Sequence, residues 1–120
     1  MEKSTLVLGA SVNTSRYSNI AIRKLIEKKN KVFAIGSKKG TVLGVSVEDG
    51  KLQFEDIDTV TLYLNPIRQK EYYQYILSLN PKRVIFNPGT ENSEFEKLLK
   101  ENNIETEIAC TLVLLSLNKY

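Results

Sequence analysis

Short, nearly uninterrupted apolar runs alternate with amphipathic segments along most of this chain. The runs lie at residues 5–8, 31–35, 59–64 and 83–86, and residues 104–108 are expected to form a fifth strand. Such runs are typical of strands that are buried on both faces, because strands with one face in solvent alternate apolar and polar residues. The pattern therefore predicts an α/β fold in which helices cover a parallel sheet on both sides.

Amphipathic segments between the runs predict the helices. The segment 17–29 repeats apolar residues at helical spacing, and Asn65 followed by Pro66 is a favoured start for a second helix. Ser93 and Glu96 have the spacing of a capping box, which predicts that a third helix begins there. Strands and helices thus alternate, as in a chain of parallel strands joined by crossover helices.

The expected strands fit one doubly wound, Rossmann-like parallel sheet of about five strands. Right-handed crossovers favour the strand order 3-2-1-4-5, in a single domain over residues 1–120. The segment 36–57 is less regular. Its runs 41–45 and 51–54 flank Glu48-Asp49-Gly50, which is a hairpin-turn signal, so we expect a small excursion at one edge of the sheet.

The composition limits the classes of function. Hydrophobic residues make up 42% of the chain and charged residues 26%, as in ordinary globular domains, and the formal net charge is only +3. There is no long basic block, so no nucleic-acid partner is expected. The apolar run near the N-terminus is too short for a secretory signal or a membrane span, so we expect a cytoplasmic protein without a membrane partner.

The chain contains one cysteine, Cys110, and no histidine. One thiol can form neither an internal disulfide nor a multi-thiolate metal site, which fits a reducing compartment and predicts no bound metal. Without histidine, the usual general base, the usual zinc ligand and the Ser-His and Cys-His pairs are missing. Most common hydrolase mechanisms are thereby excluded, and the sequence gives no good reason to assign catalytic residues or to call the chain an enzyme.

The loop after the first strand has the character of a phosphate site. It leads into a helix, whose free N–H groups and dipole favour an anion. Gly9 permits a tight turn, and Arg16 can pair with a phosphate through two hydrogen bonds. The dinucleotide fingerprint is incomplete, because Ser11 and Thr14 stand where it requires glycine, and a hydrophilic loop before a capped helix is the alternative interpretation. The candidate binding residues of this loop are Gly9, Ala10, Ser11, Asn13, Arg16, Tyr17 and Ser18.

The end of the second strand bears on which nucleotide would fit. Enzymes that bind an unmodified adenosine ribose usually place an acidic residue there. This chain instead has Gly36, Ser37, Lys38 and Lys39. Two lysines without an acid suit a ribose that carries a phosphate, which is the 2′-phosphate of NADP or the 3′-phosphate of coenzyme A. A solvated Lys-Lys turn is the alternative interpretation.

Two later loops are expected at the same edge of the sheet. Asn87, Pro88 and Gly89 follow the fourth strand and combine a fixed backbone angle with a flexible one, so they can line a narrow channel. Asn65 and Pro66 follow the third strand. Turn formation or helix capping alone could also explain each of these loops.

Cys110 begins the apolar segment 110–117, which predicts a terminal helix packed on the body of the domain. A lone cysteine is most often a small buried hydrophobe. At the start of a helix its thiol could instead exchange with the thiol of a ligand. Both interpretations stay open.

Three strings together resemble the small stand-alone coenzyme A-binding proteins. They are Gly9-Ala10-Ser11 with Arg16-Tyr17-Ser18, the segment 85–92 (IFNPGTEN) and the segment 109–113 (ACTLV). That family is similar to the coenzyme A-binding domain of the succinyl-coenzyme A synthetase α subunit, without the ligase domain. The resemblance covers nearly the whole chain, but many members have a proline-rich turn after the second strand, where this chain has Ala34-Ile35-Gly36-Ser37-Lys38.

The resemblance implies a place for each part of coenzyme A. The diphosphate would lie at the loop 9–18, the adenosine 3′-phosphate near residues 36–39, and the pantetheine would pass Asn65-Pro66 toward Asn87-Pro88-Gly89. The departure after the second strand makes the contacts to the adenosine the least supported part. The expected ligand is therefore coenzyme A.

The leading hypothesis is a protein that binds coenzyme A or an acyl-coenzyme A as a non-catalytic carrier, sensor or subunit. A small NADP-dependent oxidoreductase is the alternative, although the missing glycines and the lack of a second substrate domain count against it. An interaction domain with a vestigial nucleotide pocket is a third hypothesis. The sequence leaves open which acyl group is carried and whether the chain forms a homodimer or has another protein partner.

Overall fold

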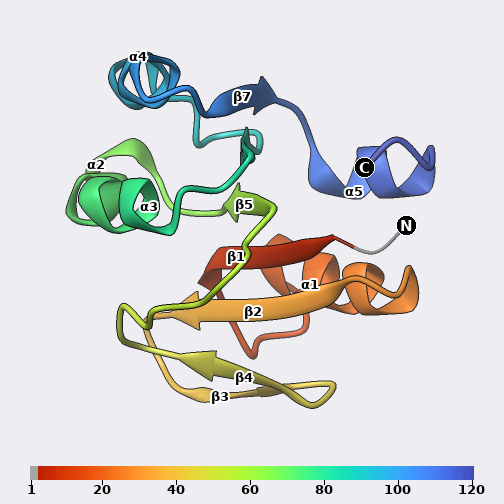
Figure 1. Ribbon diagram of the computed structural model, residues 1–120. Coiled ribbons are helices and arrows are strands. Elements are labelled where there is room, and N and C mark those ends of the chain that lie inside the picture. The colour runs from red at the N-terminus through yellow and green to blue at the C-terminus, as the bar shows by residue number, and fades with distance from the viewer. Residues whose placement is uncertain (1–2) are drawn as a thin grey trace.

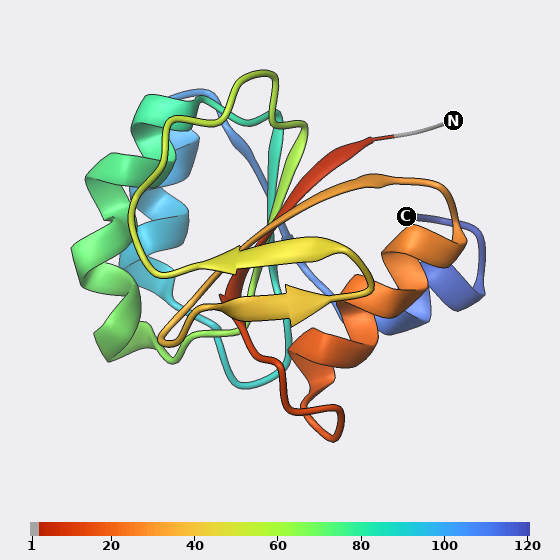
Figure 2. The same cartoon turned by 90° about the horizontal axis from the view of Figure 1, so that it is seen from below.

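The computed structural model describes residues 3–120, which form a seven-stranded sheet between two layers of helices (Figures 1 and 2). Neighbouring strands are parallel except at one edge, where β3 and β4 are antiparallel. This arrangement confirms the predicted α/β, Rossmann-like class. The strands are β1 (Ser4–Ala10), β2 (Lys31–Gly36), β3 (Gly40–Val42), β4 (Val45–Glu48), β5 (Thr59–Leu62), β6 (Arg83–Phe86) and β7 (Glu105–Ile108). The helices are α1 (Tyr17–Glu27), α2 (Pro66–Gln69), the 3₁₀ turn η1 (Lys70–Tyr72), α3 (Tyr73–Leu79), α4 (Ser93–Glu101) and α5 (Thr111–Ser116).

The predicted order of the strands was wrong. The sheet runs β3-β4-β2-β1-β5-β6-β7, so β5 lies beside β1 and not beyond β2. In terms of the five expected strands, the order is 2-1-3-4-5. The cause is the irregular segment after β2, because its strand β4 pairs with β2 through Ala34 and Val47 and occupies the place expected for the third strand.

The excursion at the edge exists, but its turn and its second strand were misplaced. The hairpin turns at Leu43-Gly44, and both residues have positive φ, 46° and 82°, as a two-residue hairpin turn requires. The segment 51–54 is not a strand. Phe54 stacks on Phe33 of β2, with ring centroids 4.5 Å apart, and the Tyr75 hydroxyl of α3 donates a hydrogen bond to the Leu52 carbonyl, so the segment is held to both the sheet and the helix.

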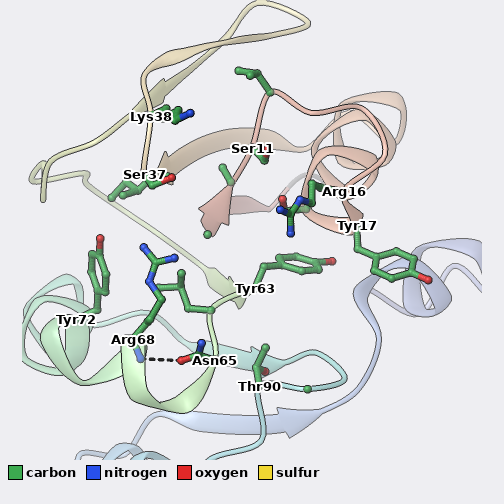
Figure 3. Close-up of a pocket in the computed structure, with 18 of the residues that line it drawn as sticks. Ser11, Arg16, Tyr17, Ser37, Lys38, Tyr63, Asn65, Arg68, Tyr72 and Thr90 are labelled. Carbon is green, nitrogen blue, oxygen red and sulfur yellow. Dashed lines mark hydrogen bonds between the residues drawn. The ribbon is translucent and has the colours of Figure 1, made fainter.

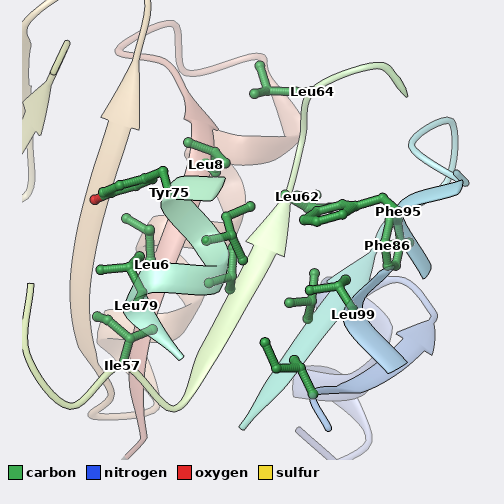
Figure 4. Close-up of a cluster of buried hydrophobic side chains, with 14 of the residues drawn as sticks. Leu6, Leu8, Ile57, Leu62, Leu64, Tyr75, Leu79, Phe86, Phe95 and Leu99 are labelled. Atoms are coloured by element: carbon green, nitrogen blue, oxygen red, sulfur yellow. The ribbon is translucent and has the colours of Figure 1, made fainter. Parts of the chain in front are cut away.

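The core lies on both faces of the sheet, as its apolar strands predicted. In β1, Leu6 and Leu8 point to one face and Val7 to the other, because side chains alternate along a strand. Leu6 and Leu8 belong to a cluster with Phe95 of α4 (Figure 4), whereas Val7 packs with Ile22 of α1. Figure 2 shows the corresponding layers, with α2, α3 and α4 on one side and α1 and α5 on the other.

Two helix starts test the expected caps. The Asn65 side chain accepts a hydrogen bond from the Arg68 amide at 2.9 Å, which confirms the cap before Pro66. The expected cap at Ser93 was wrong: the preceding Asn92 accepts a hydrogen bond from the Phe95 amide at 3.1 Å, and Ser93 is the first helical residue. The terminal helix forms as expected. No helix in residues 3–120 is long and apolar enough to cross a membrane.

Candidate functional site

A cleft of about 530 Å³ opens at the carboxyl ends of β1, β2, β5 and β6 (Figure 3). Loops that follow these four strands form its walls, in the place where parallel α/β sheets bind ligands. Its volume is within the usual range for small-molecule sites. The lining residues are Gly9, Ala10, Ser11, Val12, Arg16, Tyr17, Ser18, Ile35, Gly36, Ser37, Lys38, Tyr63, Leu64, Asn65, Arg68, Tyr72, Pro88, Gly89 and Thr90.

The lining contributed by residues 3–120 carries positive charge and no negative charge. Arg16, Lys38 and Arg68 contribute three cationic side chains, while no aspartate or glutamate of this part of the chain lines the cleft. Within the part of the chain that the structure describes, none of the three belongs to an ion pair. Three cations without a carboxylate favour an anionic ligand, because a low-dielectric concavity strengthens the field of like charges.

The first loop is held by its own polar groups and by α1. The Asn13 side chain accepts a hydrogen bond from the Ser15 amide at 3.0 Å, and Asn19 donates to the Ser11 carbonyl at 2.9 Å. Arg23 of α1 donates to Asn19 and to the Thr14 carbonyl. These bonds stabilise the loop without using the side chain of Arg16, which therefore stays available to a ligand.

Two glycines bring the backbones of the cleft close together. Gly9 has a φ of +96°, and the register of the β1–β2 pair shifts between Leu8 and Ala10, so Gly9 is left out of the ladder. A Cβ at Gly9 would lie 2.8 Å from the Tyr63 carbonyl carbon. At Gly36 a Cβ would lie 2.2 Å from the Ala10 carbonyl oxygen. Both positions thus require glycine for close approach.

The third wall of the cleft comes from the segment after β5. Arg68 and Tyr72 both reach into it, one turn apart, and Figure 3 shows their side chains beside each other. Burial raises the pKa of Tyr72 above its ordinary value, Glu71 adds to the rise, and Arg68 opposes it. The Lys51 ammonium lies over the Tyr72 ring, 5.2 Å from its centroid, and donates to the Glu71 carbonyl.

A buried polar network fixes this wall against the loop after β6. The Gln69 amide nitrogen donates to the carbonyls of Leu64 and Thr90, each at 2.8 Å. The Gln69 oxygen accepts from Asn92, which also donates to the Tyr73 hydroxyl. The network joins α2 to the Pro88-Gly89-Thr90 side of the cleft, so the two walls keep their spacing.

Asn87 lies behind the cleft and holds three elements together. Its side-chain nitrogen donates to the Thr61 hydroxyl at 2.6 Å and to the Leu62 carbonyl at 2.8 Å. Its side-chain oxygen accepts from the Thr111 amide at 2.8 Å. Asn87 is buried and does not line the cleft, so the hydrogen bonds observed for it are structural.

Tyr63 lines the cleft, and its phenol hydroxyl is buried. Among residues 3–120 this hydroxyl has no hydrogen-bond partner, and the nearby hydroxyls of Thr61 and Thr111 bond to each other at 2.8 Å. Burial raises the pKa of Tyr63 to about 12, and the neighbouring Cys110 adds to the rise. The phenol therefore stays neutral at physiological pH.

The raised pKa of Tyr63 predicts a loss of stability in alkali. An unfolded tyrosine ionises near pH 10, whereas Tyr63 ionises near 12 when folded, so its stabilising contribution is full below pH 10 and is lost as the pH rises to 12. Between pH 9 and 11 the free energy of unfolding of Tyr63→Phe should fall by about 1 kcal/mol less than that of the parent. Urea unfolding at both pH values measures this difference. The exposed Tyr17 gives the control variant Tyr17→Phe, which should fall as the parent does.

Comparison with known proteins identifies the family. The model of the CoA binding domain family matches residues 3–116. This chain belongs to the CoA binding domain family. Membership supports coenzyme A binding in general. A search of the curated proteins found no match.

Three solved structures resemble this member of the CoA binding domain family. An uncharacterized protein of known crystal structure is 50% identical, with a TM-score of 0.97, over 100% of this chain and 99% of the other. A hypothetical protein from Pyrococcus horikoshii OT3 is 28% identical, with a TM-score of 0.83, over 93% and 80%. The protein cell-free ID.343 from Thermus thermophilus is 24% identical, with a TM-score of 0.86, over 99% and 91%, and shows the fold alone.

The cleft brings together most of the candidate residues, although their roles stay predictions. Those that line it are Gly9, Ala10, Ser11, Arg16, Tyr17, Ser18, Gly36, Ser37, Lys38, Asn65, Pro88 and Gly89. Those outside its lining are Asn13, Lys39, Pro66, Asn87 and Cys110. The exposed Asn13 folds back on its own loop, and Pro66 forms the first turn of α2.

Sequence reasoning missed seven lining residues. They are Val12, Ile35, Tyr63, Leu64, Arg68, Tyr72 and Thr90. Arg68 and Tyr72 are four residues apart, so they share one face of the helix expected after Asn65, but the sequence alone does not show that this face meets the cleft.

Cys110 occupies the position before the first turn of α5, makes no side-chain capping hydrogen bond there, and is half-buried. It does not line the cleft, so exchange with a ligand thiol stays a prediction. No three Cys, Asp or Glu side chains within residues 3–120 are grouped so as to hold a metal ion.

Proposed function

We propose that this chain binds coenzyme A or an acyl-coenzyme A in the cleft, as a non-catalytic carrier, sensor or subunit of a larger assembly. The observation that carries the proposal is the set of three cations, Arg16, Lys38 and Arg68, in a cleft that no carboxylate of residues 3–120 lines. Coenzyme A carries a diphosphate and a 3′-phosphate, whereas NAD carries a diphosphate alone. A cleft with three unpaired cations favours the ligand with the extra phosphate.

The arrangement supports one orientation of the ligand. Arg16 stands at the start of α1, an eleven-residue helix whose first amides and dipole attract an anion, which favours the diphosphate there. Lys38 follows β2, at the position that contacts the ribose in related sheets. The pantetheine would then pass Asn65 and run toward Pro88 and Gly89, which line the cleft on the side of β6.

Ligand panels test the proposal. Coenzyme A at a hundredfold excess over its dissociation constant should add about 2.7 kcal/mol of stability, or roughly 10 °C in melting temperature for a domain of this size. NAD should give no comparable shift. NADP is the informative comparison, because it also carries three phosphates, and a shift with NADP alone would contradict the proposal in favour of an oxidoreductase.

The same panel on Arg16→Ala locates the site. Its exposed side chain makes no ion pair in residues 3–120, so the variant should melt with the parent when no ligand is added. Its affinity for coenzyme A should fall roughly ten- to hundredfold, as expected for a lost hydrogen bond to a charged group. Lys97→Ala, on α4 and outside the cleft, is the matched control. Equal affinities of parent and Arg16→Ala by calorimetry would refute the assigned diphosphate position.

A further inference from the structure

Arg68 has a well-anchored backbone and a guanidinium without a partner among residues 3–120. The Arg68 amide is fixed by the Asn65 cap, and α2 is held by the two hydrogen bonds of Gln69 to Leu64 and Thr90. The exposed guanidinium forms no hydrogen bond or ion pair with residues 3–120, and Figure 3 shows it pointing into the cleft. An arginine held in this way has no evident role in stabilising the fold.

The opposite wall supplies a second cation and a hydroxyl. Figure 3 shows the guanidinium of Arg68 directed toward the connection after β2, which carries Ser37 and Lys38. Arg16 lies apart from this pair, at the start of α1. The cleft therefore has one cation near the helix start and two cations on facing walls near the end of β2.

The two groups differ in what they can contribute to binding a phosphate. A guanidinium offers a planar pair of donors that matches two phosphate oxygens, whereas an ammonium acts as a point charge. A terminal phosphate monoester has three free oxygens and up to two negative charges, so it can bind both groups at once. A bridging diphosphate has fewer free oxygens on each phosphorus and is already matched to Arg16.

We propose that Arg68 and Lys38 bind the 3′-phosphate of coenzyme A from opposite walls, so that Arg68 selects coenzyme A over dephospho-coenzyme A. This inference rests on the proposed function and adds a residue that determines specificity. Lys39 lies outside the cleft lining, so among residues 3–120 Lys38 is the only lysine that lines the cleft, and Arg68 supplies the second cation expected for this phosphate.

Calorimetric titration of four proteins with two ligands tests the inference. The proteins are the parent, Arg68→Gln, Lys38→Gln and the double variant, and the ligands are coenzyme A and dephospho-coenzyme A. Arg68→Gln should weaken coenzyme A roughly ten- to hundredfold and change dephospho-coenzyme A by less than about threefold. The loss caused by Arg68→Gln should be smaller in the Lys38→Gln background, because both groups bind the same phosphate.

Two further variants serve as controls. Lys70→Gln removes a charge two residues away, outside the cleft lining, and should leave both affinities unchanged. Arg68→Lys keeps the charge and removes the planar pair of donors, so it should weaken coenzyme A alone, by several-fold. It also replaces Arg68→Gln as the test variant if the latter does not fold.

Each contrary outcome has a separate meaning. Equal losses for the two ligands in Arg68→Gln would show that Arg68 contacts the diphosphate or the base, and would overturn the inference. Unchanged affinity for coenzyme A would also overturn it, while leaving the proposed function intact. A parent protein that binds neither ligand would overturn the proposed function itself.

Discussion

The Gly36→Ala variant should lose about 3 kcal/mol of its free energy of unfolding. A Cβ at this position would lie 2.2 Å from the Ala10 carbonyl oxygen and 3.2 Å from a Val47 methyl carbon. The obstacle at 2.2 Å is backbone, and it belongs to the strand pair at the centre of the sheet, so no side-chain rotation can relieve the overlap. The register shift at Gly9 places Ala10 opposite Gly36, and the two glycines are therefore needed together.

Urea unfolding of parent and variant measures the loss. Gly50→Ala is the matched control, because a Cβ there has no atom within 4 Å and the backbone is not left-handed. This control should stay within about 1 kcal/mol of the parent and could gain stability through reduced freedom of the unfolded chain. Equal stabilities for Gly36→Ala and Gly50→Ala would show that β1 and β2 can separate at this point at little cost.

Asn87→Ala should destabilise the fold by about 3 kcal/mol. The substitution removes three buried hydrogen bonds and leaves the Leu62 carbonyl and the Thr111 amide without their partner. Unpaired buried groups of this kind cost more than the bonds contribute when made, because water cannot replace the lost partner. The loss should also loosen α5, whose first amide is held by Asn87.

Asn87→Asp separates the hydrogen bonds from the shape of the side chain. The aspartate keeps an acceptor for Thr111 but loses both donors, so a carboxylate oxygen would face the Leu62 carbonyl. Its stability should be at least as low as that of Asn87→Ala at neutral pH. The exposed Asn102 makes one local bond to Leu98, and Asn102→Ala should change stability by less than about 0.5 kcal/mol. A small effect of both Asn87 variants would contradict the structural role of this side chain.

The fold class could be predicted because strands that are buried on both faces have nearly continuous apolar sequences. The runs at β1, β5 and β6 lack the alternation of a half-exposed strand, and all three are buried almost completely. The strand order did not follow, since it depends on where the segment after β2 pairs. The pairing uses backbone groups of β4, which follows a turn at Leu43-Gly44. Leucine rarely adopts a positive φ, so the sequence does not mark this turn.

The place of the loop after β1 at the cleft could be predicted for a different reason, namely that backbone geometry at a strand end is shared by many α/β proteins. Gly9 lies at the carboxyl end of β1, and Ser11 and Arg16 lie in the connection from β1 to α1, so all three line the cleft. Arg68 and Tyr72 could not be selected with the same rule. Whether their shared helix face meets the cleft depends on the position of β5 beside β1, which was predicted on the wrong side of the sheet.

The two outer strands of the sheet limit how this protein can associate. At one edge β3 has only three residues, and at the other β7 places Glu105 and Glu107 along four residues. Short or charged edges resist the addition of a further strand, because a neighbouring chain finds few free backbone groups or meets carboxylates there. A Glu107 carboxylate oxygen also lies 3.1 Å from a guanidinium nitrogen of Arg83 in β6, and this ion pair fixes the carboxylate beside the edge strand. A second protein is therefore expected to contact helices or loops of this domain and not to extend its sheet.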